Sequence, residues 1–346
     1  MALSVSERLL CCLVLSVWST STSIQAVPRL APYDVDRAKV SVSGVSSGAC
    51  MATQYHVVYS REIMGAGIIA GAPFMCSGGL AATALGTCMT TPSMISVPAL
   101  EAITTSGALF GNVDATYHMR NDRVFIFGGT RDSVVNPVAS QKVAQYYHHY
   151  MTSSHIKAVL NINAEHGMPT LNYGGACAQL NSKTYLNNCN YSVAFQLLNH
   201  IYGGLQAPHS KTQANGQLLH FNQADFFHLA LPSAYSMDSV GYIYVPSGCA
   251  DKQHKCKLHV AFHGCKMGRV FVGEEYVRHA GYNEVGDLNN IIILYPQVIS
   301  TLTNPQGCWD WFGYTGSLFA TNKGFQLTAV RRMVSRVLGS SSSVLG

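Results

Sequence analysis

The hydrophobic and polar positions along the chain form two patterns that alternate. Short apolar runs with β-branched residues, bounded by turn residues, predict buried strands. They lie at Lys39–Ser43, Gly65–Ala72, Val124–Phe127, Lys157–Ile162, Gly241–Val245, Leu258–Phe262 and Ile291–Tyr295. Stretches with helical spacing lie between them: from about Ala49 past Val58, then Pro137–Met151, Tyr191–Tyr202, Val272–His279 and Phe325–Leu338. This alternation indicates an α/β fold with a mostly parallel sheet covered by helices on both faces.

Two stretches have no clear period. The run after Ala72, as far as about Pro98, is rich in small residues and threonine, and we expect it to be irregular. From Gly203 to Lys211, glycine, proline and polar residues fit either a domain linker or a long connection within one domain. We predict one catalytic domain over residues 27–339, followed by a flexible tail at residues 340–346.

The amino-terminal residues predict a secretory signal. Arg8 gives a weakly positive start, Leu9–Trp18 is apolar but short for a membrane span, and small polar residues follow. Cleavage after Ala26, or alternatively after Ser23, would remove the signal peptide, predicted as residues 1–26. An uncleaved anchor is the alternative. We therefore expect a secreted, extracellular protein without stable membrane association.

The composition narrows the class of protein. Hydrophobic residues make up 48% of the chain and charged residues 11%, which is typical of a globular protein and not of a disordered one. The net charge of +5 comes from scattered lysine and arginine, with no basic run interleaved with aromatic residues, so nucleic-acid binding is not expected. The sequence does not define the oligomeric state.

Nine cysteines remain after the predicted signal. Close neighbours suggest disulfides between Cys76 and Cys88, Cys177 and Cys189, and Cys249 and Cys256, with Cys265 and Cys308 as a long-range pair, although other connectivities fit the same spacing. Cys50 is left over, and we expect it to be a buried free thiol. No spacing is typical of a zinc site, so we expect disulfides and no metal. Asn190 begins an Asn-Tyr-Ser glycosylation sequon.

A nucleophile elbow is predicted where the first strand meets the first helix. Gly44-Val45-Ser46-Ser47-Gly48 fits the G-x-S-x-G pattern between a predicted strand and a predicted helix. The flanking glycines let strand and helix pack closely, which holds the Ser46 hydroxyl at the tip of the turn. A glycine-serine loop without catalytic function is the alternative.

A serine nucleophile needs a base and a carboxylate that orients the base. In α/β-hydrolases these follow the serine as acid and then histidine, at the carboxyl ends of strands. Asp132 follows the strand Val124–Phe127, and His166 follows the strand Lys157–Ile162. The order Ser46, Asp132, His166 therefore predicts a catalytic triad.

The oxyanion hole raises a question of topology. One amide is expected from Ser47, and the other usually comes from a His-Gly loop after an earlier strand. Too little chain precedes Ser46 for that strand, but Leu258–Phe262 leads into His263-Gly264-Cys265, and the strand Ile291–Tyr295 also comes late. This order predicts a circularly permuted α/β-hydrolase in which the amides of Ser47 and Cys265 meet.

The chain resembles the polyhydroxybutyrate depolymerases of the secreted, circularly permuted type with a single catalytic domain. The matching segments keep the order of that family and are spread over nearly all of the mature chain. They are VSGVSSGACMA (42–52), GGTRDSVVNP (128–137), AEHGMPT (164–170), GYIYVPSGC (241–249), HVAFHGC (259–265), GYNEVGDLNNIIILYPQ (281–297) and GCWDWFGY (307–314).

The resemblance implies roles for particular residues. Ser46 would be the nucleophile, His166 the general base and Asp132 its orienting acid, while a disulfide from Cys265 to Cys308 would tie the oxyanion loop to the tryptophan segment. The family holds polyester with a tryptophan of this segment, and either Trp309 or Trp311 fits. Lys266 stands where family members tend to have glutamine.

These observations predict a secreted serine esterase that cleaves poly(3-hydroxybutyrate) or related short-chain esters through an acyl-enzyme, without cofactor or metal. A carbohydrate esterase of the feruloyl or acetylxylan type would share the triad and is the nearest alternative. A catalytically inactive binding or storage protein on the same scaffold is the alternative from a different class.

Overall fold

The computed structural model describes residues 26–228, 230–250 and 255–340. All of the predicted signal peptide except Ala26, and all of the predicted tail except Ser340, lie outside the described residues.

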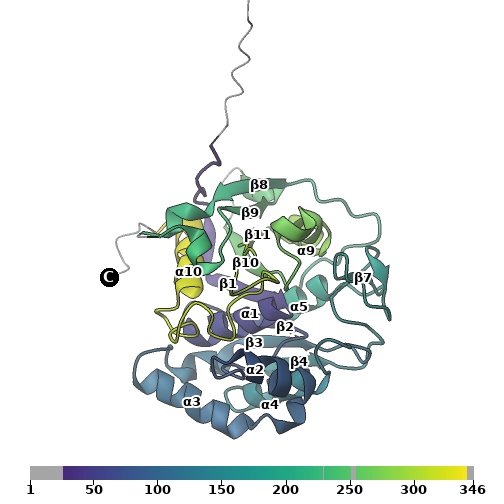
Figure 1. Ribbon diagram of the computed structural model, residues 1–346. Coiled ribbons are helices and arrows are strands. Elements are labelled where there is room, and N and C mark those ends of the chain that lie inside the picture. Colours follow the sequence, from purple (N-terminus) through teal and green to yellow (C-terminus); the bar gives the residue numbers. More distant parts are fainter. Residues whose placement is uncertain (1–25, 229, 251–254, 341–346) are drawn as a thin grey trace, which may run out of the picture.

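An eight-stranded sheet runs through the middle of the molecule (Figure 1). Its spatial order is β4 (Ile156–Val159), β3 (Arg123–Phe127), β2 (Gly65–Ile69), β1 (Val35–Val45), β10 (Cys256–Phe262), β11 (Ile291–Tyr295), β9 (Val240–Val245) and β8 (Gln217–Asn222). The first six strands are parallel, and β9 is antiparallel to both of its neighbours. The sheet is therefore mostly parallel, as predicted.

Helices cover both faces of the sheet, which explains the apolar strands. One core packs beneath α1 (Ser47–Val58), α3 (Val97–Leu109), α4 (Val138–His148) and α10 (Phe325–Val337). The second core packs beneath α5 (Val193–Tyr202), α8 (Glu275–His279) and α9 (Tyr282–Asn289). Side chains of one strand divide between the faces, since Val40 and Val42 belong to the first core while Ser41 and Ser43 alternate with them along β1.

The structure corrects one sequence expectation and distinguishes between the two alternatives for residues 203–211. The run expected to be irregular contains α2 (Ala81–Thr83), a π-helical segment (Ala84–Thr90) and the start of α3. These helices bury few side chains, so their hydrophobic period is weak. Residues 203–211 are no domain linker, because they lead from α5 to β8 of the same sheet. The strand β8 was not predicted from the sequence, because it is an edge strand in which only Phe221 is buried.

Smaller elements complete the fold. A three-stranded parallel sheet has the order β5 (Met168–Thr170), β7 (Leu186–Asn188) and β6 (Gly175–Ala176). The short helices α6 (Ser247–Ala250) and α7 (Arg269–Val272) flank β10 in the sequence.

Disulfides join Cys76 to Cys88, Cys177 to Cys189, Cys249 to Cys256 and Cys265 to Cys308, with the predicted pairing. Cys50 is free and buried.

The strand that carries the His-Gly turn lies directly beside the elbow strand. β10 pairs with β1 in parallel, with Gly44 opposite Phe262, and β11 follows on the other side of β10. The carboxyl ends of β1 and β10 therefore meet at one edge of the sheet. The circular permutation itself stays a prediction, and this order is the one that it requires.

Candidate active site

Ser46 occupies a strained turn between β1 and α1. Its φ is 59° and its ψ is −123°, a conformation that residues other than glycine rarely adopt. The turn is held from both sides, because the Ser46 N–H donates to the Ile69 carbonyl at 2.9 Å and the Ser46 carbonyl accepts from the Ala49 N–H at 2.9 Å. Such strain at a fixed turn is the geometry of a nucleophile elbow.

The two flanking glycines permit this turn. A Cβ on Gly44 would lie 2.1 Å from the Gly48 carbonyl oxygen, so no side chain fits between strand and helix. A Cβ on Gly48 would lie 2.4 Å from the carbonyl oxygens of both Phe262 and His263. Gly48 therefore lets the end of β10 approach the first turn of α1, which brings the two predicted oxyanion segments together.

Asp132 and His166 form a buried pair. The His166 Nδ1 lies 2.8 Å from the Asp132 Oδ2, and the two side chains are 5% and 2% exposed. The other carboxylate oxygen, Oδ1, accepts the N–H groups of Val134 at 3.0 Å and Val135 at 2.7 Å. The carboxylate is thus fixed on one side by backbone and orients the imidazole on the other, as an orienting acid must.

A second carboxylate, which sequence reasoning missed, ties the Asp132 loop to the His166 loop. The buried Glu165 accepts the backbone N–H of Ser133 at 2.9 Å and also its hydroxyl. The Asn187 side chain donates to the carbonyls of Glu165 at 3.2 Å and His166 at 3.4 Å. Nothing in the sequence distinguishes Glu165 from a solvent-exposed loop glutamate, because its partner lies 32 residues away.

Ser46 and His166 line the same cavity of about 440 Å³. Its other lining residues are mostly apolar or small, and Lys266 is the only lysine, arginine, aspartate or glutamate among them. Among the described residues Ser46 and His166 share no hydrogen bond. In unliganded enzymes such bonds are often long and shorten when substrate binds.

The structure separates the two candidate tryptophans. Trp311 lines the cavity, whereas Trp309 is fully buried and packs edge-on against Phe262.

Cys50 also lines the cavity, one turn into α1, and burial raises its pKa to about 12. It is therefore a protonated thiol at neutral pH and a poor nucleophile.

The amides of Ser47 and Cys265 are free to bind a ligand oxygen. Within the described parts of the chain, neither N–H donates a hydrogen bond to a protein acceptor. Ser47 is the first residue of α1, and Cys265 lies three residues after β10. A Cβ on Gly264 would lie 3.2 Å from the Ser46 Cβ, so the turn that carries Cys265 packs against the elbow. Two unpaired amides beside a serine fit an oxyanion hole.

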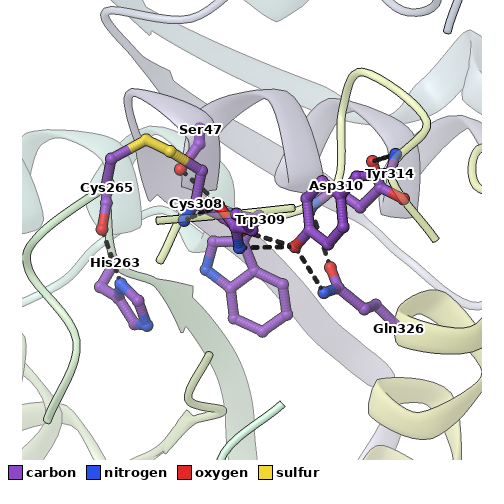
Figure 2. The surroundings of a disulfide bond; sticks show 10 residues. Ser47, His263, Cys265, Cys308, Trp309, Asp310, Tyr314 and Gln326 are labelled. Atoms are coloured by element: carbon purple, nitrogen blue, oxygen red, sulfur yellow. Dashed lines mark hydrogen bonds between the residues drawn. A yellow bond between two sulfur atoms is a disulfide. The ribbon is translucent and has the colours of Figure 1, made fainter. Parts of the chain in front are cut away.

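The tryptophan segment, residues 307–314, connects the Cys265 turn to the start of α1 (Figure 2). Cys308 is bonded to Cys265, and the next residue, Trp309, donates its N–H to the Ser47 hydroxyl at 3.2 Å. Asp310 lies beyond them, and burial raises the pKa of its carboxyl. It holds a turn by accepting the N–H groups of Gly313, Tyr314 and Thr315.

Among the described residues, no three histidine, cysteine, aspartate or glutamate side chains are grouped so that they could hold a metal ion. None of the helices in the described ranges is long and apolar enough to cross a membrane.

Comparison with known proteins gives relatives across nearly the whole chain. A poly(3-hydroxybutyrate) depolymerase of Delftia acidovorans is 38% identical over 91% of this chain, which spans 63% of the length of that protein. A polyhydroxybutyrate depolymerase of Talaromyces funiculosus is 33% identical over 90% of this chain and 93% of its own length. No family model matches the chain.

Solved structures give the same result. A PHB depolymerase complexed with an R3HB trimer has a TM-score of 0.83 and 31% identity, over 90% of this chain and 99% of that one. The crystal structure of PHB depolymerase from Penicillium funiculosum has a TM-score of 0.81, with the same identity and coverage.

Proposed function

The chain belongs to the polyhydroxybutyrate depolymerase family, and we propose that it is a secreted serine esterase that hydrolyses poly(3-hydroxybutyrate) or its oligomers. The observation that carries this proposal is the meeting of three parts at one apolar cavity: the Ser46 elbow, the Asp132–His166 pair and the free amides of Ser47 and Cys265.

The reaction proceeds through an acyl-enzyme. The Ser46 oxygen attacks the ester carbonyl while His166 takes the hydroxyl proton, and the C–O bond to the leaving alkoxide breaks as His166 returns that proton to it. Water then attacks the acyl-enzyme and gives up a proton to His166, which passes it to the Ser46 oxygen as the bond between that oxygen and the acyl carbon breaks and the acid product leaves. Asp132 keeps the imidazole in the tautomer that leaves Nε2 free to accept the proton.

The negative charge that develops on the ester oxygen is stabilised by the amides of Ser47 and Cys265. Loss of one such donor typically raises the barrier by about 3–4 kcal/mol. The apolar lining, including Trp311 and Met267, suits an aliphatic polyester, which offers methyl and methylene groups and no charge along its chain.

Product analysis tests the proposal. Purified enzyme is incubated with (R)-3-hydroxybutyrate trimer and, separately, with polymer film, and the soluble acids are separated and identified. We expect monomer and dimer from the trimer. Feruloyl esters and acetylated xylan are assayed in parallel, and a preference for either by orders of magnitude would replace polyester hydrolysis with carbohydrate-ester hydrolysis. Absence of turnover on all four substrates would support the inactive scaffold.

Secretion and glycosylation are part of the same proposal. Asn190 is exposed and directly follows Cys189 of the Cys177–Cys189 disulfide, so its side chain is accessible to a glycan. Expression in a eukaryotic secretory host should give protein that begins near Val27 and loses mass on enzymatic deglycosylation, and Asn190→Gln should abolish that loss.

A further inference from the structure

His263, the residue after β10, fixes the turn that carries the Cys265 amide. It is fully buried, its Nδ1 lies 2.7 Å from the Gly264 carbonyl oxygen, and its Nε2 lies 3.2 Å from the Val298 nitrogen. A backbone N–H can only donate, so Nε2 is the acceptor and Nδ1 carries the proton that is donated to Gly264. Burial lowers the pKa of His263 to about 4, which keeps this neutral form at pH 7.

The Gly264 carbonyl and the Cys265 N–H belong to one planar peptide unit and point in opposite directions. Holding the carbonyl therefore aims the N–H. The Cys265–Cys308 bond and the Lys266 N–H, which donates to Gln306 at 2.8 Å, position the chain on either side of that amide without setting its direction. The Gly264 carbonyl also accepts the Met267 N–H at 3.2 Å within the same turn, and the shorter hydrogen bond from His263 is the contact that a neighbouring side chain makes to this peptide.

We propose that His263 is a positioning residue for catalysis: it orients the Gly264–Cys265 peptide so that its N–H meets the developing oxyanion. This inference rests on the proposed esterase function. His263 does not touch the substrate, so its removal affects the transition state more than substrate binding, which distinguishes it from a residue of the cavity wall.

Two variants of His263 separate orientation from packing. The amide nitrogen of His263→Asn lies at the position of Nδ1 and can donate to Gly264, whereas the amide of His263→Gln lies one bond further out, near Nε2. His259→Gln is the matched control, because His259 is equally buried and lies on β10, the strand that leads into His263, but bonds the hydroxyls of Ser41 and Ser43.

Steady-state kinetics on the trimer and thermal unfolding are measured for all three variants. We expect His263→Gln to lower kcat about 10- to 100-fold with KM nearly unchanged, and His263→Asn to retain a kcat much closer to that of the wild type. His259→Gln should keep a kcat near wild type even though that protein is less stable. Wild-type kcat in folded His263→Gln, or an equal kcat loss in His259→Gln, would overturn the proposal. An inactive wild-type enzyme would instead refute the esterase function.

A second cavity of the protein is lined by arginines. It measures about 370 Å³ and shares no lining residue with the cavity at Ser46. Of the twelve arginines in the chain, five line it, together with the carboxylates of Glu62 and Asp225. The formal excess is therefore three positive charges, compared with +5 for the whole chain. The arginines are Arg37, Arg61, Arg331, Arg332 and Arg336.

Both carboxylates are already engaged. Glu62 pairs with Arg331, and Asp225 pairs with Arg29, which lies outside the cavity. The other four arginines make no ion pair within the described residues, although Arg37 donates to the Leu338 carbonyl and the Ser340 hydroxyl, and the Arg332 Nη1 donates to the Phe226 carbonyl at 3.0 Å. The Arg332 Nε is buried without a hydrogen-bond partner, and an unpaired buried donor is costly unless a ligand or water meets it.

We infer that this arginine cavity binds an oligoanion with two or more phosphate or sulfate groups. Guanidinium forks bind tetrahedral oxyanions in a bidentate manner, and four arginines without an ion pair around one small cavity favour a ligand with several such groups over a single carboxylate.

Titration calorimetry of the full chain in 0.15 M NaCl tests this, with sodium tripolyphosphate as the probe and a sulfated disaccharide to distinguish phosphate from sulfate. We expect saturable binding near one equivalent, weakened about tenfold or more in Arg332→Gln/Arg336→Gln and unchanged in Arg120→Gln/Arg123→Gln, two exposed arginines elsewhere. No saturable binding below about 1 mM, or an equal loss in both double variants, would overturn it.

Discussion

The candidate site has two halves that are built in different ways. The early half comprises Ser46, Asp132 and His166, each at the end of its own strand and held by hydrogen bonds of the adjoining loops. The late half comprises the turn at Cys265 and the segment around Cys308, held by a disulfide and by the His263 side chain. The early half supplies reactive side chains, whereas the late half supplies a backbone N–H.

This difference decides how each half responds to change. A side chain that performs proton transfer has no substitute, so its replacement removes the function. An N–H remains after almost any substitution, and only its direction and distance can be altered. Variants of the late half should therefore give graded losses, and variants of the early half nearly complete ones.

The largest effect should come from Asp132→Asn. The amide preserves shape but favours the wrong imidazole tautomer, so kcat should fall about 10⁴-fold. Kinetics on the trimer at pH 7 measure this, with Asp36→Asn as control because Asp36 lies near the start of β1 and, within the described residues, its carboxylate accepts only the Ala38 N–H. Comparable losses in both variants would mean that Asp132 is a structural turn residue.

Removal of the Cys265–Cys308 disulfide should give a smaller and divided effect. Replacing both cysteines by alanine should lower the free energy of unfolding by about 2–4 kcal/mol and kcat by about 10- to 100-fold. Alanine at Cys249 and Cys256 is the control, since that disulfide lies at the start of β10, the opposite end from the Cys265 turn, and should affect stability without kcat. Equal kcat in the two double variants would separate the tryptophan segment from catalysis.

Acid should lower the free energy of unfolding through two buried histidines of the β10 region. Burial lowers the pKa of His259 to about 3 and of His263 to about 4, whereas both titrate near 6.5 when unfolded. Between these values the unfolded chain binds more protons, so the free energy of unfolding is highest above about pH 6.5 and falls as the pH is lowered towards 4. Urea unfolding at pH 7, 6, 5 and 4 measures the slope, which should be shallower in His259→Gln. An unchanged slope would contradict neutral burial of His259.

The smallest effect concerns Lys266, which lines the cavity with no ion pair or side-chain hydrogen bond within the described residues. An exposed cation should attract the free carboxylate of an oligomer only weakly. Lys266→Gln should raise KM for the trimer acid about two- to threefold and leave KM for its methyl ester unchanged. An equal change for both substrates would exclude a charge effect.

The early half could be read from the sequence because its signals are local. Strand ends, flanking glycines and residue order placed Ser46, Asp132 and His166, and the structure brings Ser46 and His166 to one cavity and pairs Asp132 with His166. The edge strand β8 and the helices between residues 81 and 109 were missed or expected to be irregular, because exposure or small side chains remove the hydrophobic period.

The late half could be predicted from the sequence only in part. A His-Gly turn after an apolar strand predicted Cys265. Which of Trp309 and Trp311 lines the cavity could not be predicted, because two tryptophans of the same short segment differ only in how the folded chain packs around them. Glu165 and His263 act through partners that sequence spacing does not mark, such as the Gly264 carbonyl and the distant Ser133 and Val298 amides.

Covalent labelling tests the central claim most directly, that Ser46 is the nucleophile activated by the early half. Wild-type enzyme and Ser46→Ala are treated with a fluorophosphonate, and intact mass and peptide mapping are recorded. We predict one adduct per chain, located on the peptide that contains Ser46 and absent from Ser46→Ala. Labelling that persists in Ser46→Ala, or that maps to another residue, would contradict the account.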